Sequence, residues 1–438
     1  MEYKRCSSYI PGLGALTGYY QPGQLNPATP NMEYRHCSSC FPGLEALTGY
    51  YQLGQLSPGF FSELVTAPLP PFSSGLGTGK GGVREFVLTE WEEAGLPMTT
   101  TSNEACKLYD AALSQYVGWY ELEELAGLET TVEAMINTEP TFVMGHVVNV
   151  GLDLLSTGKS LLANPQLSDN LSLLNSLCKQ QKITSREHMH VQALRHFADG
   201  HFLRAAELWE TILIDHPSDM LAIKFAHDTY FYTGEQMQVR DSIARVLPYW
   251  NPTMPHYGYL HGMHAFGLVE TNLFRQAELA AKKGLQFNAY DGWSTHALAH
   301  VYEMEGRTDE GILFLLNTEK KWERCGLLAC HNYWHWAIYH MEDGNYKTAM
   351  ELYEDRIQQY LKDKSILNIV DCASLLFRLK IADWPVRSEL WRDVYNVVEP
   401  HLEDHITTFN DIHFLMTCLG ADEMASAANL QETYINME

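Results

Sequence analysis

Histidines at helical spacing are the residues of this sequence that are best placed to do chemistry. His296 and His300 are four residues apart, and Glu303 follows three residues later. His331 and His335 repeat the four-residue spacing further along the chain. Because residues at i and i+4 share one face of an α-helix, each pair can present two imidazoles to the same point. Imidazoles with a carboxylate beside them suit a transition metal such as zinc or iron.

Three interpretations of these five residues stay open. They could hold a transition metal, which is the only cofactor that the sequence suggests. They could act without a metal, with Glu303 and a histidine sharing a proton in acid–base catalysis. They could also form hydrogen bonds between packed helices, or bind a peptide terminus. Neither pair is a zincin motif, because Ala297 and Asn332 follow the first histidines where that motif has its general-base glutamate.

The segments that must position these side chains are predicted to be helices. From about residue 86, helix-sized stretches are separated by single Gly or Pro residues, and the alternation typical of strands is nearly absent. Thr101-Ser102-Asn103-Glu104 predicts a helix start with Thr101 as the cap. The turn residues Asn272 and Gly306 are 34 residues apart, which is the tetratricopeptide period. The sequence therefore predicts an all-α, tetratricopeptide-type solenoid of helical hairpins, with units near 186–219, 220–253, 258–291, 292–325 and 330–363.

In repeats of this kind, the first helix of each hairpin lines a concave groove. The predicted register places a further set of polar and aromatic residues in that groove, where a peptide or a small polar ligand would bind. These ligand-groove candidates are His190, Lys224, Asp228, Phe231, Tyr259 and Trp334.

The two ends of the chain differ in composition from its middle. Residues 1–85 are rich in Gly, Pro, Ser and Tyr, and residues 1–27 match residues 32–58 at 20 of 27 positions. Such a chain cannot bury enough apolar surface to offset its ordering entropy, so we predict a disordered, duplicated leader and linker. The helical repeats are expected over 86–420. Residues 421–438 are expected to form a divergent tail.

Composition excludes several classes of function. The chain carries 54 acidic against 30 basic residues, a formal charge of −24, which argues against nucleic acid and anionic membrane surfaces as partners. No apolar run approaches the roughly 18 residues of a membrane helix, so no membrane insertion is expected. No targeting signal is recognisable, and nine cysteines are too few for a disulfide framework. We therefore predict a cytoplasmic location.

Residues from about 91 to 420 resemble the tetratricopeptide repeat protein 38 family. Four phrases carry the resemblance, which implies a repeat protein with little assigned biochemistry. The leader has no counterpart in that family, and the family continues through further helices after Gly420. The phrases are Thr101-Ser102-Asn103-Glu104-Ala105-Cys106-Lys107-Leu108, Thr141-Phe142-Val143-Met144-Gly145-His146, Cys330-His331-Asn332-Tyr333-Trp334-His335-Trp336 and His413-Phe414-Leu415-Met416.

Two functions are compatible with these observations. The first is a binding or scaffold protein whose groove receives a protein, a peptide or a small polar ligand, as α-solenoids commonly do. A basic or metal-bearing ligand suits the negative field of the repeats better than an acidic chain end. The alternative is an enzyme, such as a metal-dependent hydrolase, that uses the histidines and Glu303. The sequence favours the binding protein over the enzyme.

Overall fold

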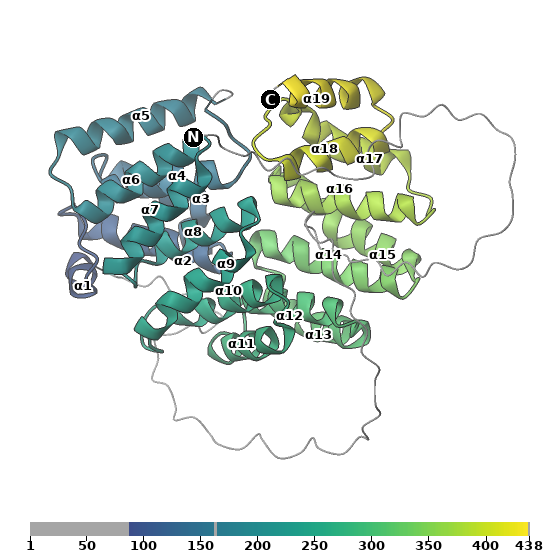
Figure 1. Ribbon diagram of the computed structural model, residues 1–438, viewed down its shortest axis with the longest axis horizontal. Helices are drawn as coiled ribbons and strands as arrows, with labels where there is room; N and C mark the ends of the chain where they lie inside the picture. Colours follow the sequence, from purple (N-terminus) through teal and green to yellow (C-terminus); the bar gives the residue numbers. More distant parts are fainter. Residues whose placement is uncertain (1–86, 162–163, 437–438) are drawn as a thin grey trace, which may run out of the picture. The chain divides into compact units, whose positions relative to one another are not determined.

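The computed structural model describes residues 87–161 and 164–436, all within one compact unit of the chain (Figure 1). This described part contains nineteen α-helices and no strand, so the all-α prediction is confirmed. None of its helices has the length and apolar character needed to cross a membrane. The leader and linker predicted at 1–85 lie outside the described residues.

The N-terminal helices pack on one another and on the first repeat-like hairpins. The second helix packs against the third and reaches the eighth, and the fourth packs against the fifth, sixth and eighth. Their bounds are α1 (Leu88–Glu93), α2 (Asn103–Gly118), α3 (Gly127–Thr138), α4 (Val143–Leu155) and α5 (Pro165–Gln180).

Five helical hairpins follow, and the first helices of the later hairpins contact one another in chain order. Further helices complete the described chain after the last hairpin (Figure 1). The hairpins are α6 (Ser185–Ala198) with α7 (Phe202–Asp215), α8 (Met220–Thr233) with α9 (Gln236–Val246), α10 (Tyr257–Glu270) with α11 (Phe274–Phe287), α12 (Gly292–Met304) with α13 (Thr308–Trp322), and α14 (Gly326–Glu342) with α15 (Tyr346–Leu352). The remaining helices are α16 (Ile366–Ile381), α17 (Ser388–Val398), α18 (Thr408–Gly420) and α19 (Met424–Asn436).

Residues with a left-handed backbone make the tight turns within the hairpins. Gly306 and Gly344 have φ values of 66° and 74°, and Asn272 takes the equivalent position with a φ of 60°. Glycine and asparagine adopt this conformation at little cost, which ends one helix and starts the next within a few residues. Ala299 and Ala337, on the helices before two of these turns, are fully buried and let the paired helices approach closely.

The first described long helix begins one residue later than its local pattern predicts. Ser102, rather than Thr101, is the N-cap of α2, and its Oγ accepts a hydrogen bond from the Ala105 amide at 3.1 Å. The Ser102 amide in turn donates to Thr100 Oγ1 at 3.0 Å. Thr100 also bonds the Glu139 carboxylate after α3, so a tertiary contact helps to set the start of the helix.

The C-terminal end of α2 lies against the first helices of the hairpins. The Tyr116 hydroxyl donates to Asp228 Oδ2 on α8 at 2.6 Å. The Trp293 ring on α12 donates through Nε1 to the Val117 carbonyl at 2.9 Å. This part of the face that would line a groove is therefore covered by the chain itself.

Candidate functional site

Two consecutive hairpins bring four histidines to one point. His296 and His300 lie on α12, and His331 and His335 lie on α14. One ring nitrogen from each of the four lies within 4.8 Å of the others. The two pairs are separated by 35 residues at both positions, so the first helices of neighbouring hairpins present two pairs with the same internal spacing. We call these four residues the histidine cluster.

The imidazoles of the histidine cluster contact one another directly. His300 Nε2 and His296 Nε2 are 2.8 Å apart, so one of the two nitrogens donates a hydrogen bond and the other accepts it. The ring centroids of His300 and His335 are 4.3 Å apart, and those of His331 and His335 are 4.7 Å apart. Four imidazoles at these distances form a nitrogen-rich site of the kind that holds a transition metal.

Two carboxylates accept hydrogen bonds from the Nδ1 atoms of His331 and His335. Glu303 Oε2 lies 2.7 Å from His335 Nδ1, and Asp371 Oδ1 lies 2.8 Å from His331 Nδ1. A carboxylate accepts, so each Nδ1 carries a proton, and Nε2 of the neutral ring keeps its lone pair. The sequence suggested Glu303 as a ligand or a base. In the structure it contacts His335 Nδ1 and is not one of the four groups that converge.

Sequence reasoning did not identify Asp371 as part of this site. It lies on α16 between Val370 and Cys372, and all three residues are buried. A single carboxylate in an apolar stretch of helix is the signal that could have found it, because buried carboxylates need a partner. The identity of that partner depends on how α16 packs against α14.

Burial controls the protonation of the cluster. His296 and His335 are 5% and 0% exposed, and burial together with neighbouring imidazoles lowers the pKa of both rings well below 6.5. The pKa of His300 is lowered well below 6.5 for the same reasons. Burial alone would also lower the pKa of His331, but the Asp371 carboxylate outweighs it and raises that pKa. At neutral pH, at least three of the rings are therefore neutral, which is the form that binds a metal.

Two buried nitrogens of the cluster lack a hydrogen-bond partner. His296 Nδ1 and His335 Nε2 are both buried, and no described residue pairs with either of them. An unpaired buried polar atom costs about 1–3 kcal/mol, so such atoms are rare without a reason. The carboxylate on the Nδ1 side of His335 leaves its Nε2 as an acceptor, and a bound cation would satisfy it.

Aromatic rings surround the cluster. The Phe266 ring lies 5.2 Å from the His296 ring, and Trp334 stacks on His331 at 5.2 Å with 7° between the ring planes. The Arg378 guanidinium lies 5.5 Å above the Trp334 ring. Of the two α14 histidines, His331 has 19% of its side chain accessible, whereas that of His335 is fully buried. Because the cluster is mostly buried, water screens its interactions with an ion only weakly.

The helix that carries His296 and His300 begins at a buried carboxyl group. Asp291 caps α12, and its Oδ1 accepts a hydrogen bond from the Trp293 amide at 3.0 Å. Burial raises the pKa of Asp291 to about 7, although hydrogen bonds from Ser294 and the backbone act in the opposite direction. The folded protein therefore binds this proton more tightly than the unfolded chain.

A pH dependence of stability follows from Asp291. We expect the free energy of unfolding to fall as pH rises from about 4 to about 7, because the folded state must then give up a proton that it holds tightly. Asp291→Asn is expected to flatten this decline and to be more stable than the parent by about 2–4 kcal/mol at pH 8. Urea unfolding at several pH values, with exposed Asp309→Asn as the control, measures the difference. An Asp291→Asn profile parallel to that of the parent would contradict the assignment.

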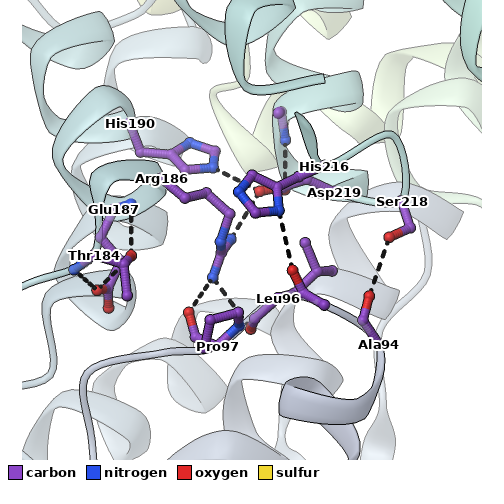
Figure 2. A network of polar contacts seen from close by, with 12 residues as sticks. Ala94, Leu96, Pro97, Thr184, Arg186, Glu187, His190, His216, Ser218 and Asp219 are labelled. Carbon is purple, nitrogen blue, oxygen red and sulfur yellow. Dashed lines mark hydrogen bonds and ion pairs between the residues drawn. The ribbon is translucent and has the colours of Figure 1, made fainter. Parts of the chain in front are cut away.

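His190, a predicted groove residue, belongs to a separate buried network (Figure 2). His190 Nε2 lies 3.0 Å from Asp219 Oδ2, and Arg186 donates to the same oxygen at 2.7 Å. Arg186 also donates to the Leu96 and Pro97 carbonyls at 3.3 and 3.0 Å. The network joins α6 to the start of α8 and to the segment after α1, and it lies apart from the histidine cluster.

The other predicted groove residues are covered to different degrees. Lys224 is fully buried, forms an ion pair with Asp228 and lies over the rings of Tyr116 and Trp119 at 4.3 and 4.6 Å. Burial lowers the pKa of Lys224, against the opposing effect of Asp228. Trp334 is buried against the histidine cluster, whereas Phe231 and Tyr259 are half-buried. Lys224 and Asp228 satisfy each other beneath α2 rather than lining an open groove.

Comparisons with known proteins give only distant likenesses. No family model matches the chain. It is similar to the Rap protein complexed with competence and sporulation factor, with 12% identity and a TM-score of 0.45 over 76% of this chain and 98% of that chain. It is also similar to the human IFIT1 dimer with PPP-AAAA, with 12% identity and a TM-score of 0.46 over 77% of each chain. The yeast Tom70 structure gives 14% identity and a TM-score of 0.33 over 76% of this chain and 85% of that chain. These identities are too low to carry a ligand or an activity over to this chain.

Proposed function

We propose that this helical-repeat protein binds one transition-metal ion, with zinc as the expected ion, through the histidine cluster. The observation that carries the proposal is the convergence of four ring nitrogens, from α12 and α14, within 4.8 Å of one another. Imidazole nitrogens are ligands for zinc, copper, nickel and cobalt, and the absence of thiolate and carboxylate from this set disfavours softer and harder ions.

The dimensions of the cluster fit such an ion after small movements of the rings. Zinc–nitrogen bonds of about 2.0–2.1 Å place neighbouring ligand atoms of a tetrahedron about 3.4 Å apart. The present His296–His300 nitrogen distance of 2.8 Å is shorter, and the full spread of up to 4.8 Å is wider. An ion would therefore replace the hydrogen bond between these two rings and draw the other two inward. The carboxylates of Glu303 and Asp371 would balance its double positive charge.

The geometry of the cluster supports metal binding better than it supports catalysis by a bound metal. Four protein ligands complete a tetrahedral zinc site, whereas catalytic zinc sites keep one position for water or substrate. The alternative of a metal-dependent hydrolase would need one of the four histidines to leave the ion. A peptide in the groove is also less well supported, because the end of α2 covers Lys224 and Asp228.

We also propose that the chain is related to the tetratricopeptide repeat protein 38 family. The four phrases that carry the resemblance fall at the starts of α2 and α4, within α14 and within α18. The α14 phrase includes His331 and His335. Two of the four proposed metal ligands therefore lie within a segment on which the resemblance rests. A cytoplasmic location stays a prediction from the sequence.

Metal analysis of the purified full-length chain tests the proposed function. We expect one zinc per chain, and about 100-fold or greater loss of zinc affinity in the His300→Ala/His335→Ala variant. The control is His196→Ala/His201→Ala, a second histidine pair whose rings are 6.0 Å apart but which lies outside the cluster. Circular dichroism establishes that each variant is helical. A metal-free parent chain that binds no zinc, cobalt, nickel or copper would overturn the proposal, as would full zinc binding by the cluster variant.

A further inference from the structure

Carboxylates from two different helices accept hydrogen bonds from the Nδ1 atoms of two cluster histidines. Glu303 belongs to α12 and holds His335 of α14. Asp371 belongs to α16 and holds His331 of α14. The cluster and its carboxylates thus extend over three helices, α12, α14 and α16, and α16 supplies no member of the four-histidine set.

The contacts of His331 fix its ring in two independent ways. Donation from Nδ1 to Asp371 selects the tautomer in which Nε2 has the free lone pair. Stacking on Trp334, with 7° between the ring planes, limits rotation of the imidazole. Asp371 is 5% exposed, so little water competes for its hydrogen bond to the ring. His335 is held in a comparable way, because Glu303 is 6% exposed and the His335 side chain is fully buried.

On the basis of the proposed function, we infer that Asp371 and Glu303 are positioning residues of the metal site, and that Asp371 transmits ion binding to α16. Each carboxylate keeps the proton on Nδ1 and aims Nε2 at the ion. Coordination at Nε2 makes the Nδ1–H group a stronger donor, so the bond to each carboxylate strengthens when the ion is bound. Because such coupling is reciprocal, Asp371 strengthens ion binding by the same free energy with which the ion strengthens the contact between α14 and α16.

The test compares zinc affinity and hydrogen exchange in the full-length chain. Asp371→Asn keeps the shape of the side chain but removes its charge, and we expect zinc affinity to fall roughly 10- to 100-fold. Glu303→Gln is expected to have a similar effect through His335. The matched control is Asp404→Asn, because Asp404 Oδ2 lies 2.7 Å from His401 Nδ1 in another histidine–carboxylate pair away from the cluster.

Two further readouts separate positioning from general stability. Nitrogen-15 NMR of the metal-free parent chain should show His331 protonated at Nδ1, and Asp371→Asn should shift His331 toward a mixture of tautomers. Zinc should slow amide exchange in α16 of the parent chain but not of Asp371→Asn. Parent-like zinc affinity in folded Asp371→Asn and Glu303→Gln would overturn this inference while leaving metal binding by the cluster intact. A parent chain that binds no ion would overturn the proposed function itself.

Discussion

Asp219→Ala is expected to lower the free energy of unfolding by about 3–5 kcal/mol, because it leaves the charge of Arg186 buried without its partner. Arg186 and Asp219 are 3% and 2% exposed, and their ion pair measures 2.7 Å (Figure 2). The same carboxylate caps α8 by accepting from the Ala222 amide at 3.0 Å, and it also holds His190. One substitution therefore removes an ion pair, a helix cap and a buried hydrogen bond.

Chemical denaturation of the parent, Asp219→Ala and Arg186→Met/Asp219→Leu measures this effect. The double variant removes both charges and is expected to be considerably more stable than Asp219→Ala. Burial alone would raise the pKa of Asp219, but His190 and Arg186 hold it well below its usual range. This contribution to stability is therefore complete above about pH 4 and is lost as pH falls. If the free energy of unfolding of Asp219→Ala fell by less than 1 kcal/mol, the network would contribute little to the packing of α6 against α8.

Zinc is expected to stabilise the metal-free protein by about 4 kcal/mol when its free concentration is a thousand times the dissociation constant. The physical reason is that the four ligands converge only in the folded chain, so the ion binds the folded state in preference to the unfolded one. We expect a rise of several degrees in the thermal midpoint, reversed by a chelator.

Thermal unfolding followed by circular dichroism, with and without zinc, provides the measurement. The His300→Ala/His335→Ala variant should show no zinc-dependent rise, whereas His196→Ala/His201→Ala should respond as the parent does. Equal rises in all three proteins would mean that zinc stabilises the chain through other sites.

Features that depend on neighbouring residues in the chain could be predicted from the sequence. The turns at Asn272, Gly306 and Gly344 have the left-handed backbone that their residue types predict. The spacing of the histidines placed His296 and His300 on one helix and His331 and His335 on the first helix of the following hairpin. In both cases the determining interactions lie within one turn or one hairpin.

Features that depend on how hairpins pack could not be predicted. Asp371 reaches His331 across 40 residues, and no periodic pattern marks the pair. Lys224 and Asp228 were expected in an open groove, but the end of α2, more than 100 residues earlier, covers them. Even the cap of α2 lies one residue later than predicted, and Thr100 beside it bonds Glu139, which follows α3.

The histidine pairs and the hairpins that carry them follow different spacings. Both histidine separations are 35 residues, whereas the equivalent turn residues Gly306 and Gly344 are 38 residues apart. A tandem copy of the α12 hairpin would therefore place its second pair at positions 334 and 338, which are Trp334 and Ile338. The four histidines meet because α12 and α14 carry the same four-residue spacing at different points along their lengths, and repetition of one hairpin does not account for the site.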